Sequence, residues 1–302
     1  MATVTASYPS PRALLEKYGL RAKKSWGQNF LGDDGILSDI ARLAAPRAGD
    51  PVVELGAGLG HLTARLVARG ARVIAVERDR EMAEVLRGEL GAEVTLVEAD
   101  AARLEYAALA RQSAGGSSTS TSTTTATSTT TTTTTGGGKI AVVGNLPYHL
   151  TSPILFSVLD QVEAVSRAVF LVQREVAERL AAEPGTHDWG ILSVLLQREA
   201  DVSIERVVPP GAFLPPPKVE SAVLCALFRP PADAVADPVR FRRLVKAGFA
   251  QRRKTLGNAL KAARLVPPDA LAAALAAAGI DPGRRGETLT VAEWAALDRA
   301  FG

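Results

Sequence analysis

Short apolar runs alternate with helical patterns through the first two thirds of the chain. In one helical pattern, Leu59, Leu62 and Leu66 form an apolar face that ends at Gly70. The apolar runs that predict strands are Pro51–Leu55, Arg72–Glu77, Glu93–Glu98, Lys139–Gly144 and Ala168–Val172. Strands that are apolar throughout and alternate with helices predict a mostly parallel sheet covered by helices on both faces.

Two later runs, Val202–Val208 and Ser221–Phe228, follow one another across a proline-rich loop that leaves no room for a helix. They predict an antiparallel hairpin at the end of the sheet. The stretch 230–237 contains a Pro-Pro pair and predicts a linker, and residues 238–302 are rich in Ala, Leu and Arg. We therefore expect an α/β fold with a Rossmann-like domain over 1–229 and a small all-α domain over 238–302.

The segment 112–138 differs from the rest of the chain because it consists almost entirely of Ser, Thr and Gly. It has no side chains that could anchor a core and offset its ordering entropy, so it predicts a disordered insertion. Regular patterns resume on both sides, which favours a loop within a domain over a domain boundary. A functional tract is the alternative.

The composition of the 302 residues, 47% hydrophobic and 22% charged, is typical of a soluble globular protein. No apolar run reaches the length of a membrane helix, and Met1–Arg12 lacks the apolar core of a secretory signal. Cys225 is the single cysteine and cannot form an internal disulfide, so we expect a cytoplasmic protein. We expect His61 to start a helix and His187 to lie in a loop. No metal site is predicted, because the sequence has no His/Cys cluster.

Basic residues are concentrated in two places, although the net charge is only +3. Between Pro238 and Arg264 the chain has nine Lys or Arg residues and no Asp or Glu. Lys23 and Lys24 belong to a smaller basic group near the N-terminus. A solvated helix face is the alternative, but the long run has no acidic residue at the spacing for i,i+4 pairing. The run therefore favours contact with a phosphate backbone.

The first predicted strand leads directly into the glycine loop, Glu54-Leu55-Gly56-Ala57-Gly58-Leu59-Gly60, and a helix follows. Glycines at this place let the backbone approach a ligand, but NAD-binding folds share the feature. The spacing here is G-x-G-x-G instead of G-x-G-x-x-G, and Glu54 would repel a pyrophosphate. It would attract the sulfonium and ammonium groups of S-adenosylmethionine, so we expect Gly56 and Gly58 to approach this cofactor.

Two more carboxylates follow the next two predicted strands. Glu77 ends the second strand, where open α/β sheets place the carboxylate that binds ribose hydroxyls. Asp100 follows the third strand and is placed to hold the exocyclic amine of adenine. Each acid alone is compatible with an exposed loop residue. Three acids after three successive strands predict an S-adenosylmethionine site.

The fourth predicted strand ends in Asn145-Leu146-Pro147-Tyr148, which suits methylation of an adenine amine. That amine is a poor nucleophile, because its lone pair is delocalised into the ring. The Asn145 side-chain carbonyl and the Leu146 backbone carbonyl, held by Pro147, can accept its two hydrogens and aim the lone pair at a methyl carbon. The ring of Tyr148 can stack on an extruded base. The alternative is an Asn-Pro turn leaving a strand, which the neighbouring glycine loop disfavours.

Together these motifs resemble the ribosomal RNA adenine N6,N6-dimethyltransferases that act on the small subunit. The resemblance extends from about Tyr18 to Thr290, interrupted by the insertion. The matching stretches are Lys23–Leu31, the glycine loop, Val143–Tyr148, Val208–Phe213, Pro215–Val223 and Gln251–Thr255. The resemblance implies a class I S-adenosylmethionine-dependent methyltransferase fold. It also implies dimethylation of two adjacent adenosines in a hairpin loop near the 3′ end of 16S rRNA. The enzyme would be a monomer that acts on the immature small ribosomal subunit and contributes to its biogenesis.

The resemblance also implies roles for individual residues. Gln28, Asn29 and Leu31 would close over the cofactor, and Phe213 would stack on the base opposite Tyr148. The rest of the cofactor site would consist of Gly56, Glu77, Asp100 and Asn145. The rRNA contacts would come from Lys23, Lys24, Lys218, Arg252, Arg253 and Lys254.

Three other functions share part of this pattern. Large-subunit rRNA adenine methyltransferases of the antibiotic-resistance type have similar Gln-Asn-Phe and Asn-Pro-Tyr motifs, although Gln251–Lys254 and Pro215–Val219 favour the small-subunit enzymes. DNA adenine methyltransferases usually carry Asp/Asn-Pro-Pro-Tyr, which this chain lacks. The third is a mainly non-catalytic ribosome assembly factor. The intact Glu77, Asp100 and Asn145 argue that catalysis is retained.

Overall fold

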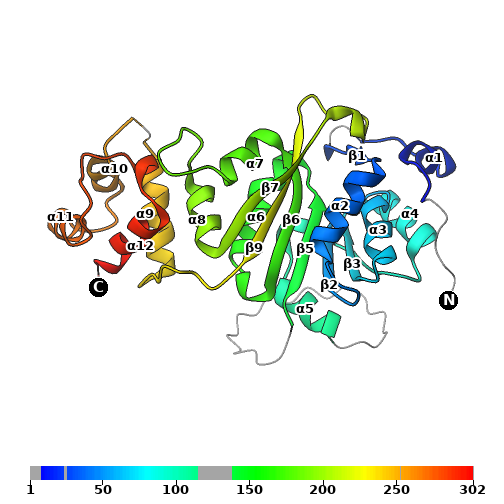
Figure 1. Cartoon of the computed structure of the whole chain (residues 1–302), viewed down its shortest axis with the longest axis horizontal. Helices are drawn as coiled ribbons and strands as arrows, with labels where there is room; N and C mark the ends of the chain where they lie inside the picture. The colour runs from blue at the N-terminus through cyan, green and yellow to red at the C-terminus, as the bar shows by residue number, and fades with distance from the viewer. Residues whose placement is uncertain (1–7, 24–25, 115–137, 252, 302) are drawn as a thin grey trace. The chain divides into compact units, whose positions relative to one another are not determined.

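Figure 1 shows the computed structural model of the chain, which describes residues 8–23, 26–114, 138–251 and 253–301. Two predicted RNA contacts, Lys24 and Arg252, lie outside the described residues, as does most of the predicted insertion. The chain forms two compact units, Met1–Val172 with Val208–Val223, and Gln173–Val207 with Leu224–Gly302. No helix of the described ranges is long and apolar enough to cross a membrane.

The first unit is built on a parallel sheet. Its strands are β2 (Pro51–Leu55), β3 (Arg72–Glu77), β4 (Thr95–Glu98), β5 (Ile140–Asn145) and β6 (Val165–Gln173). All pair in parallel, β2 with β3 and β5, β3 with β4, and β5 with β6. Val52, Val53 and Leu55 in β2 are fully buried although they alternate between the two faces. A strand in the middle of a sheet covered on both faces requires this apolar sequence.

The strand order of the whole sheet is β4-β3-β2-β5-β6-β9-β7. The last two strands are β9 (Ser221–Phe228) and β7 (Ala200–Val208), and the segment between them contains no α-helix. A mostly parallel sheet with an antiparallel pair at its end confirms the predicted fold class. The predicted strand boundaries are less accurate, since β4 begins at Thr95 and β6 begins at Val165.

Helices connect the strands of the first unit. They are α1 (Pro11–Lys17), α2 (Asp34–Ala44), α3 (His61–Ala68), α4 (Arg80–Leu90), α5 (Tyr106–Ala114) and α6 (Thr151–Leu159). Asp33 and Asp79 cap α2 and α4 by accepting backbone N–H groups of the first turn. His61 starts α3, as predicted. Because α5 continues to Ala114, the predicted disorder starts too early at Gln112.

A second, two-stranded sheet joins distant parts of the first unit. Strand β1 (Phe30–Leu31) pairs antiparallel with β8 (Phe213–Leu214), and Leu31 lies opposite Phe213. The pair connects the Gln-Asn-Phe motif to the proline-rich loop that precedes β9. Strands of two residues leave no periodic pattern, so the sequence did not predict this pairing.

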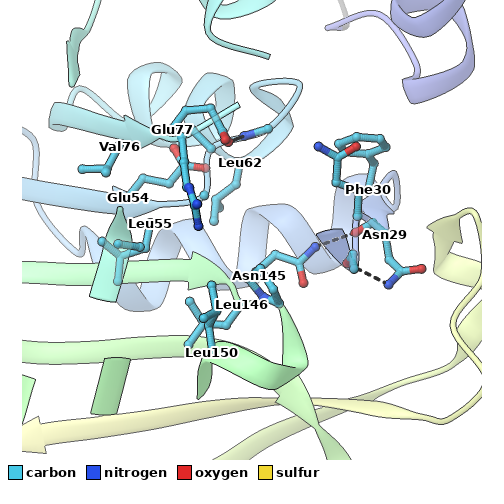
Figure 2. Close-up of a pocket in the computed structure, with 18 of the residues that line it drawn as sticks. Asn29, Phe30, Glu54, Leu55, Leu62, Val76, Glu77, Asn145, Leu146 and Leu150 are labelled. Carbon is cyan, nitrogen blue, oxygen red and sulfur yellow. Dashed lines mark hydrogen bonds between the residues drawn. The ribbon is translucent and has the colours of Figure 1, made fainter. Parts of the chain in front are cut away.

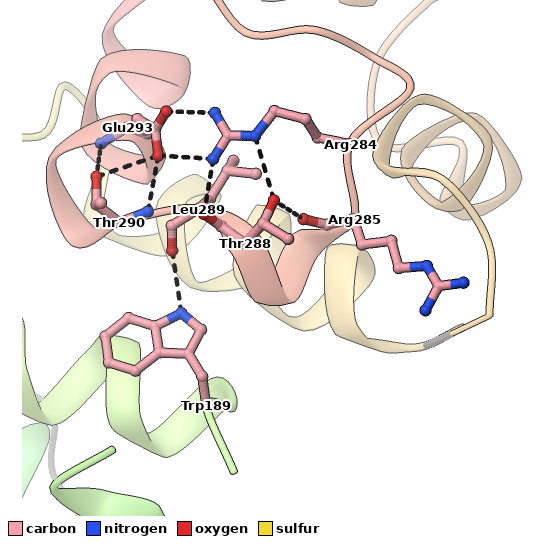
Figure 3. A network of polar contacts seen from close by, with 7 residues as sticks. All are labelled: Trp189, Arg284, Arg285, Thr288, Leu289, Thr290 and Glu293. Carbon is pink, nitrogen blue, oxygen red and sulfur yellow. Dashed lines mark hydrogen bonds and ion pairs between the residues drawn. The ribbon is translucent and has the colours of Figure 1, made fainter. Parts of the chain in front are cut away.

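The second unit is mainly helical. Its helices are α7 (Arg174–Leu180), α8 (Ile191–Glu199), α9 (Pro238–Phe249), α10 (Leu256–Ala263), α11 (Pro268–Ala277) and α12 (Val291–Arg299). Figure 3 shows how the loop before α8 is attached to the C-terminal segment. The indole N–H of the fully buried Trp189 donates to the carbonyl of Leu289 at 3.0 Å. Beside it, the Arg284 guanidinium pairs with the Glu293 carboxylate, which also accepts the backbone N–H of Thr290 at 2.8 Å.

The sequence predicts a domain boundary near residue 229, but the second unit also contains residues before it, Gln173–Val207 and 224–228. The Pro-Pro pair does mark an irregular stretch, but this stretch is anchored. The buried Asp298 carboxylate accepts the backbone N–H groups of Ala236 and Asp237 at 2.7 and 3.0 Å. Helix α8 contacts α9 and α12, so the residues before β7 pack with the C-terminal helices. Local composition detects the irregular backbone but not these long-range contacts.

Candidate active site

A cavity of about 340 Å³ lies at the carboxyl ends of β2, β3 and β5 in the first unit. Open parallel sheets bind ligands at this edge. The predicted residues that line the cavity are Gln28, Asn29, Leu31, Glu54, Gly56, Gly58, Glu77, Asp100, Asn145, Leu146, Pro147 and Tyr148. Figure 2 shows Glu54, Glu77 and Asn145 around the same space. The structure therefore brings together every residue predicted to bind the cofactor and most of those predicted to act in catalysis.

The glycine loop turns sharply between β2 and α3. Gly58 and Gly60 have φ angles of +56° and +85°, in a region that other residues rarely adopt. A Cβ on Gly60 would also lie 2.6 Å from the Tyr8 hydroxyl oxygen. Gly58 donates its backbone N–H to the Glu77 carboxylate at 2.8 Å. The part of the loop around Gly58 is thus attached to the end of the neighbouring strand β3.

Glu77 is held rigidly at the end of β3. Its two carboxylate oxygens accept the backbone N–H groups of Asp79 and Gly58 at 2.7 and 2.8 Å. Burial raises the pKa of Glu77, and these hydrogen bonds oppose the rise. Each carboxylate oxygen keeps a lone pair, so the group can still accept a hydroxyl hydrogen of a ribose.

Glu54 is the buried acid at the start of the glycine loop. Its side chain is 2% exposed, and its Oε2 atom has no hydrogen-bond partner among the described residues. Burial raises the pKa of Glu54 to about 8, and the nearby Glu77 carboxylate adds to the rise. A buried carboxyl group without a counter-ion suits a cationic ligand. This donor set fits S-adenosylmethionine, which carries two positive groups.

Asp100 lies at the outer edge of the cavity. Its carboxylate accepts the backbone N–H of Ala102 at 3.0 Å and pairs with Arg78 at 3.5 Å. Arg78 also lies over the ring of Trp26, with 5.5 Å between the guanidinium carbon and the ring centroid. Trp26 lines the cavity and is 41% exposed. Neither residue was predicted to belong to the site, although Trp26 lies within the matching stretch Lys23–Leu31.

Gln28 anchors the segment that carries this motif. Its amide oxygen accepts the Lys23 backbone N–H at 2.8 Å, and its amide nitrogen donates to the Asp79 carboxylate at 2.9 Å. The Lys23 ammonium pairs with Asp79 and Glu81 at 2.8 and 2.7 Å. Lys23, predicted to contact RNA, therefore has its charge balanced by two acids and ties the segment to α4.

Asn145 occupies the centre of the cavity wall. Its amide nitrogen donates to the backbone carbonyl of Asn29 at 2.7 Å (Figure 2). This hydrogen bond fixes the orientation of the amide and leaves its carbonyl oxygen as an acceptor. The Leu146 backbone N–H donates to the carbonyl of Leu171 at 3.1 Å, which holds the following peptide against β6. The Asn145 side chain is therefore held by Asn29, and the backbone that leads to the Leu146 carbonyl is held by β6.

Tyr148 and Phe213 differ in their positions. The Tyr148 hydroxyl is hydrogen-bonded to the Ser221 hydroxyl at 3.0 Å, and Tyr148 lines the cavity. Phe213 is 6% exposed, lies opposite Leu31 in the small sheet and is not among the residues that line the cavity. Its neighbour Leu31 does reach the cavity wall. Stacking of Phe213 on a base remains a prediction.

The basic run of the second unit is partly structural. Arg240 pairs with Asp298 at 2.8 Å, a partner far away in the sequence that spacing rules did not reveal. Arg253 and Lys254 are exposed, and neither side chain pairs with an acid within the described part of the chain. Lys218, in the first unit, is exposed too. These cations are available to bind an anionic partner.

Comparisons with known proteins show which family the chain resembles. A family model described as Ribosomal RNA adenine dimethylase matches residues 19–300. The Ribosomal RNA small subunit methyltransferase A of Anaeromyxobacter dehalogenans is 73% identical over 99% of this chain and 100% of its own. The crystal structure of the 23S rRNA methyltransferase ErmE is similar, with 26% identity, a TM-score of 0.63, and 90% and 99% of the two chains covered.

A dimethyladenosine transferase from Plasmodium falciparum has the same fold, with a TM-score of 0.67 and 22% identity over 89% of this chain and 95% of its own. These likenesses confirm the predicted methyltransferase fold. With a family model that spans nearly the whole chain, the protein belongs to the ribosomal RNA adenine dimethylase family.

Proposed function

We propose that this protein uses S-adenosylmethionine to dimethylate the N6 amines of two adjacent adenosines in 16S rRNA. The target would be the hairpin loop near the 3′ end, within the immature small ribosomal subunit. The observation that carries the proposal is the fixed Asn145 amide, which leaves a carbonyl oxygen in a cavity lined by three carboxylates. High identity to a small-subunit methyltransferase supports the choice of substrate.

The cofactor would be held by residues of the glycine loop and of the next two strand ends. Glu54 would face its cationic part, Glu77 its ribose hydroxyls and Asp100 its adenine amine. When bound, S-adenosylmethionine supplies an electrophilic methyl group. Gln28 and Asn29 would cover it, because their segment is tied to Asp79 and to Asn145 at the cavity wall.

The target adenine would enter beside Tyr148. The Asn145 side-chain carbonyl and the Leu146 backbone carbonyl would accept its two N6 hydrogens and direct the lone pair at the methyl carbon. Because both groups are already fixed, little reorganisation accompanies the reaction. Tyr148 would stack on the flipped base, with its hydroxyl held by Ser221. Each transfer would form an N6–CH3 bond as the S–CH3 bond breaks and leaves S-adenosylhomocysteine, and N6 would lose one proton to solvent. In the second methylation one of the two carbonyls would accept the single remaining N6 hydrogen.

The exposed cations would dock the ribosomal RNA through its phosphates. Arg253, Lys254 and Lys218 are exposed and suited to this contact, and Arg252 belongs to the same basic stretch of the sequence. Lys23 would contribute through its position beside Asp79 and not as a free charge. We propose that the enzyme acts as a monomer and contributes to small-subunit biogenesis through this binding.

The test is to map labelled methyl groups. Purified protein and labelled S-adenosylmethionine are incubated with unmethylated 30S particles and, separately, with 50S particles. We expect label on two adjacent adenosines near the 3′ end of 16S rRNA, and none when Asn145→Ala replaces the wild type. Label on 50S particles would indicate the large-subunit activity, and binding to 30S particles without label would indicate an assembly factor.

A further inference from the structure

The segment before α1 contacts the outside of the glycine loop. The Tyr8 hydroxyl donates to the Leu59 backbone carbonyl at 2.7 Å. Leu59 stands between Gly58 and Gly60 and itself lines the cavity. Burial raises the pKa of Tyr8 further above its ordinary value, so the hydroxyl stays protonated and keeps its donor role. A side chain near the N-terminus thus holds the main chain of the loop that would carry the cofactor.

The next residue holds the other end of the same loop. The Pro9 carbonyl lies 2.9 Å from Nε2 of His61, the first residue of α3. A carbonyl can only accept, so Nε2 must carry the hydrogen. Burial lowers the pKa of His61 to about 4, so the ring is neutral at physiological pH. The edge-to-face contact between His61 and Tyr8, with centroids 5.2 Å apart, joins the two attachments.

The Tyr8 ring also fills space between the loop and α4. It packs against one apolar cluster that includes Leu59 and Met82 and against a second that includes Ala57 and Leu86. Its hydroxyl oxygen would lie 2.6 Å from a Cβ at Gly60, so the tyrosine and the glycine fit each other. The ring therefore restricts the path of the loop by contact as well as by hydrogen bonding.

We infer that Tyr8 is a positioning residue for the cofactor, an inference that rests on the proposed function of the cavity. A loop with three glycines at positive φ can adopt many conformations, and the ligand must select one of them. The contacts of Tyr8 and Pro9 restrict the loop before the ligand arrives. Both residues lie outside the range 19–300 that the family model matches, so that match does not describe their contacts.

The experiment compares Tyr8→Phe with Tyr18→Phe in the full chain. Tyr8→Phe keeps the ring packing and removes only the hydroxyl that holds Leu59. Tyr18 is the matched control, because its hydroxyl donates to Glu89 on α4 at 2.7 Å and does not touch the glycine loop. Both substitutions remove one partly buried hydrogen bond from the N-terminal region.

We expect Tyr8→Phe to weaken S-adenosylmethionine binding, measured by calorimetry without RNA, by about two- to tenfold, the effect of one ordinary hydrogen bond. The KM for the cofactor should rise by the same factor, while kcat and the KM for 30S particles stay unchanged. Tyr18→Phe should leave cofactor affinity unchanged even if it lowers the melting temperature as much.

Unchanged cofactor affinity in Tyr8→Phe would overturn the inference. An equal loss of affinity in both variants would overturn it too, because the effect would then be general destabilisation. If the wild type binds S-adenosylmethionine but methylates no adenosine in 16S rRNA, the proposed function fails. The difference between the two variants in cofactor binding would still decide the role of Tyr8.

Discussion

The cavity of the first unit and the basic run of the second unit differ in how far their charged side chains are exposed to water. In the cavity, Glu54 and Glu77 are almost fully buried, and Glu54 has an oxygen without a partner among the described residues. In the basic run, Arg253 and Lys254 are exposed to water. Burial strengthens the attraction for one small cation, whereas exposed charges bind a long polyanion with little geometric demand.

This difference separates two kinds of function. A buried, hydrogen-bonded site fixes reacting groups and therefore controls the rate of the chemical step. An exposed basic surface controls affinity and depends on salt. Substitutions in the two regions are therefore expected to fail in different ways.

The largest effect is expected at Asn145. Asn145→Ala removes the proposed side-chain acceptor for the target amine, so methyl transfer should fall by about 10³-fold, as for the loss of a preorganised group. Binding to 30S particles should stay close to wild type. The measurement is single-turnover methylation together with a filter-binding titration. A variant that loses rRNA binding to the same extent would show that Asn145 supports the fold and not the reaction.

The second largest effect is expected for the triple variant Arg252→Ala, Arg253→Ala, Lys254→Ala, which should weaken rRNA binding. Each lost phosphate contact lowers the log–log salt slope by about 0.7–0.9, so the slope should fall by up to about three units. Binding is measured between 50 and 200 mM salt, a range over which phosphate contacts change affinity strongly.

The control for this variant is Arg174→Ala with Arg179→Ala. These arginines of α7 are also exposed, but they pair with Glu178 and Glu175 on their own helix. Their loss should leave the salt slope unchanged. An unchanged slope in the triple variant would mean that the basic run is a solvated helix face.

At Glu77 the effect should be confined to the cofactor. Glu77→Ala is expected to weaken S-adenosylmethionine binding by about 1.5–3 kcal/mol, the value of hydrogen bonds to a charged group. Glu98→Ala is the matched control, because Glu98 ends the neighbouring strand, pairs with Arg87 and does not line the cavity. Calorimetry that finds the two variants equal would remove Glu77 from the site.

The smallest effect concerns the pH dependence of cofactor binding through Glu54. Burial raises the pKa of Glu54 to about 8, so at a lower pH the carboxyl is mostly neutral. It must then lose its proton before it can attract a cation. Affinity should therefore rise with pH, by up to about tenfold per unit below pH 8, and level off above it. The titration is repeated between pH 6.5 and 8.5 with Glu54→Gln, which should remove this rise. Parallel curves for the two proteins would contradict the role of Glu54.

The cavity was predictable from the sequence, because its groups follow strands that local patterns identify. Parallel strands bring their carboxyl ends to one edge, so Glu54, Glu77, Asp100 and Asn145 had to lie near one another. Position in a strand does not reveal hydrogen-bond partners. The bond from Asn145 to Asn29 fixes the amide, and it joins segments that no local pattern connects.

The second unit was less predictable for the same reason. Helices α9 to α12 were expected, but the attachment of Trp189 to Leu289 and of Arg240 to Asp298 depends on contacts between distant segments. The Tyr8 contact with the glycine loop belongs to this group as well. Composition and spacing report on neighbours in the sequence, and these interactions join residues that only the folded chain brings together.

The most direct test of the account compares the Asn145→Ala and basic triple variants in one methylation assay. Label transfer to 30S particles is measured at low salt while enzyme concentration is raised well above that needed by the wild type. The triple variant should recover much of the wild-type methylation, because its cavity is untouched and excess enzyme compensates for weak docking. Asn145→Ala should stay inactive at every concentration. Recovery of Asn145→Ala, or failure of the triple variant to recover, would contradict the division between a catalytic cavity and a docking surface.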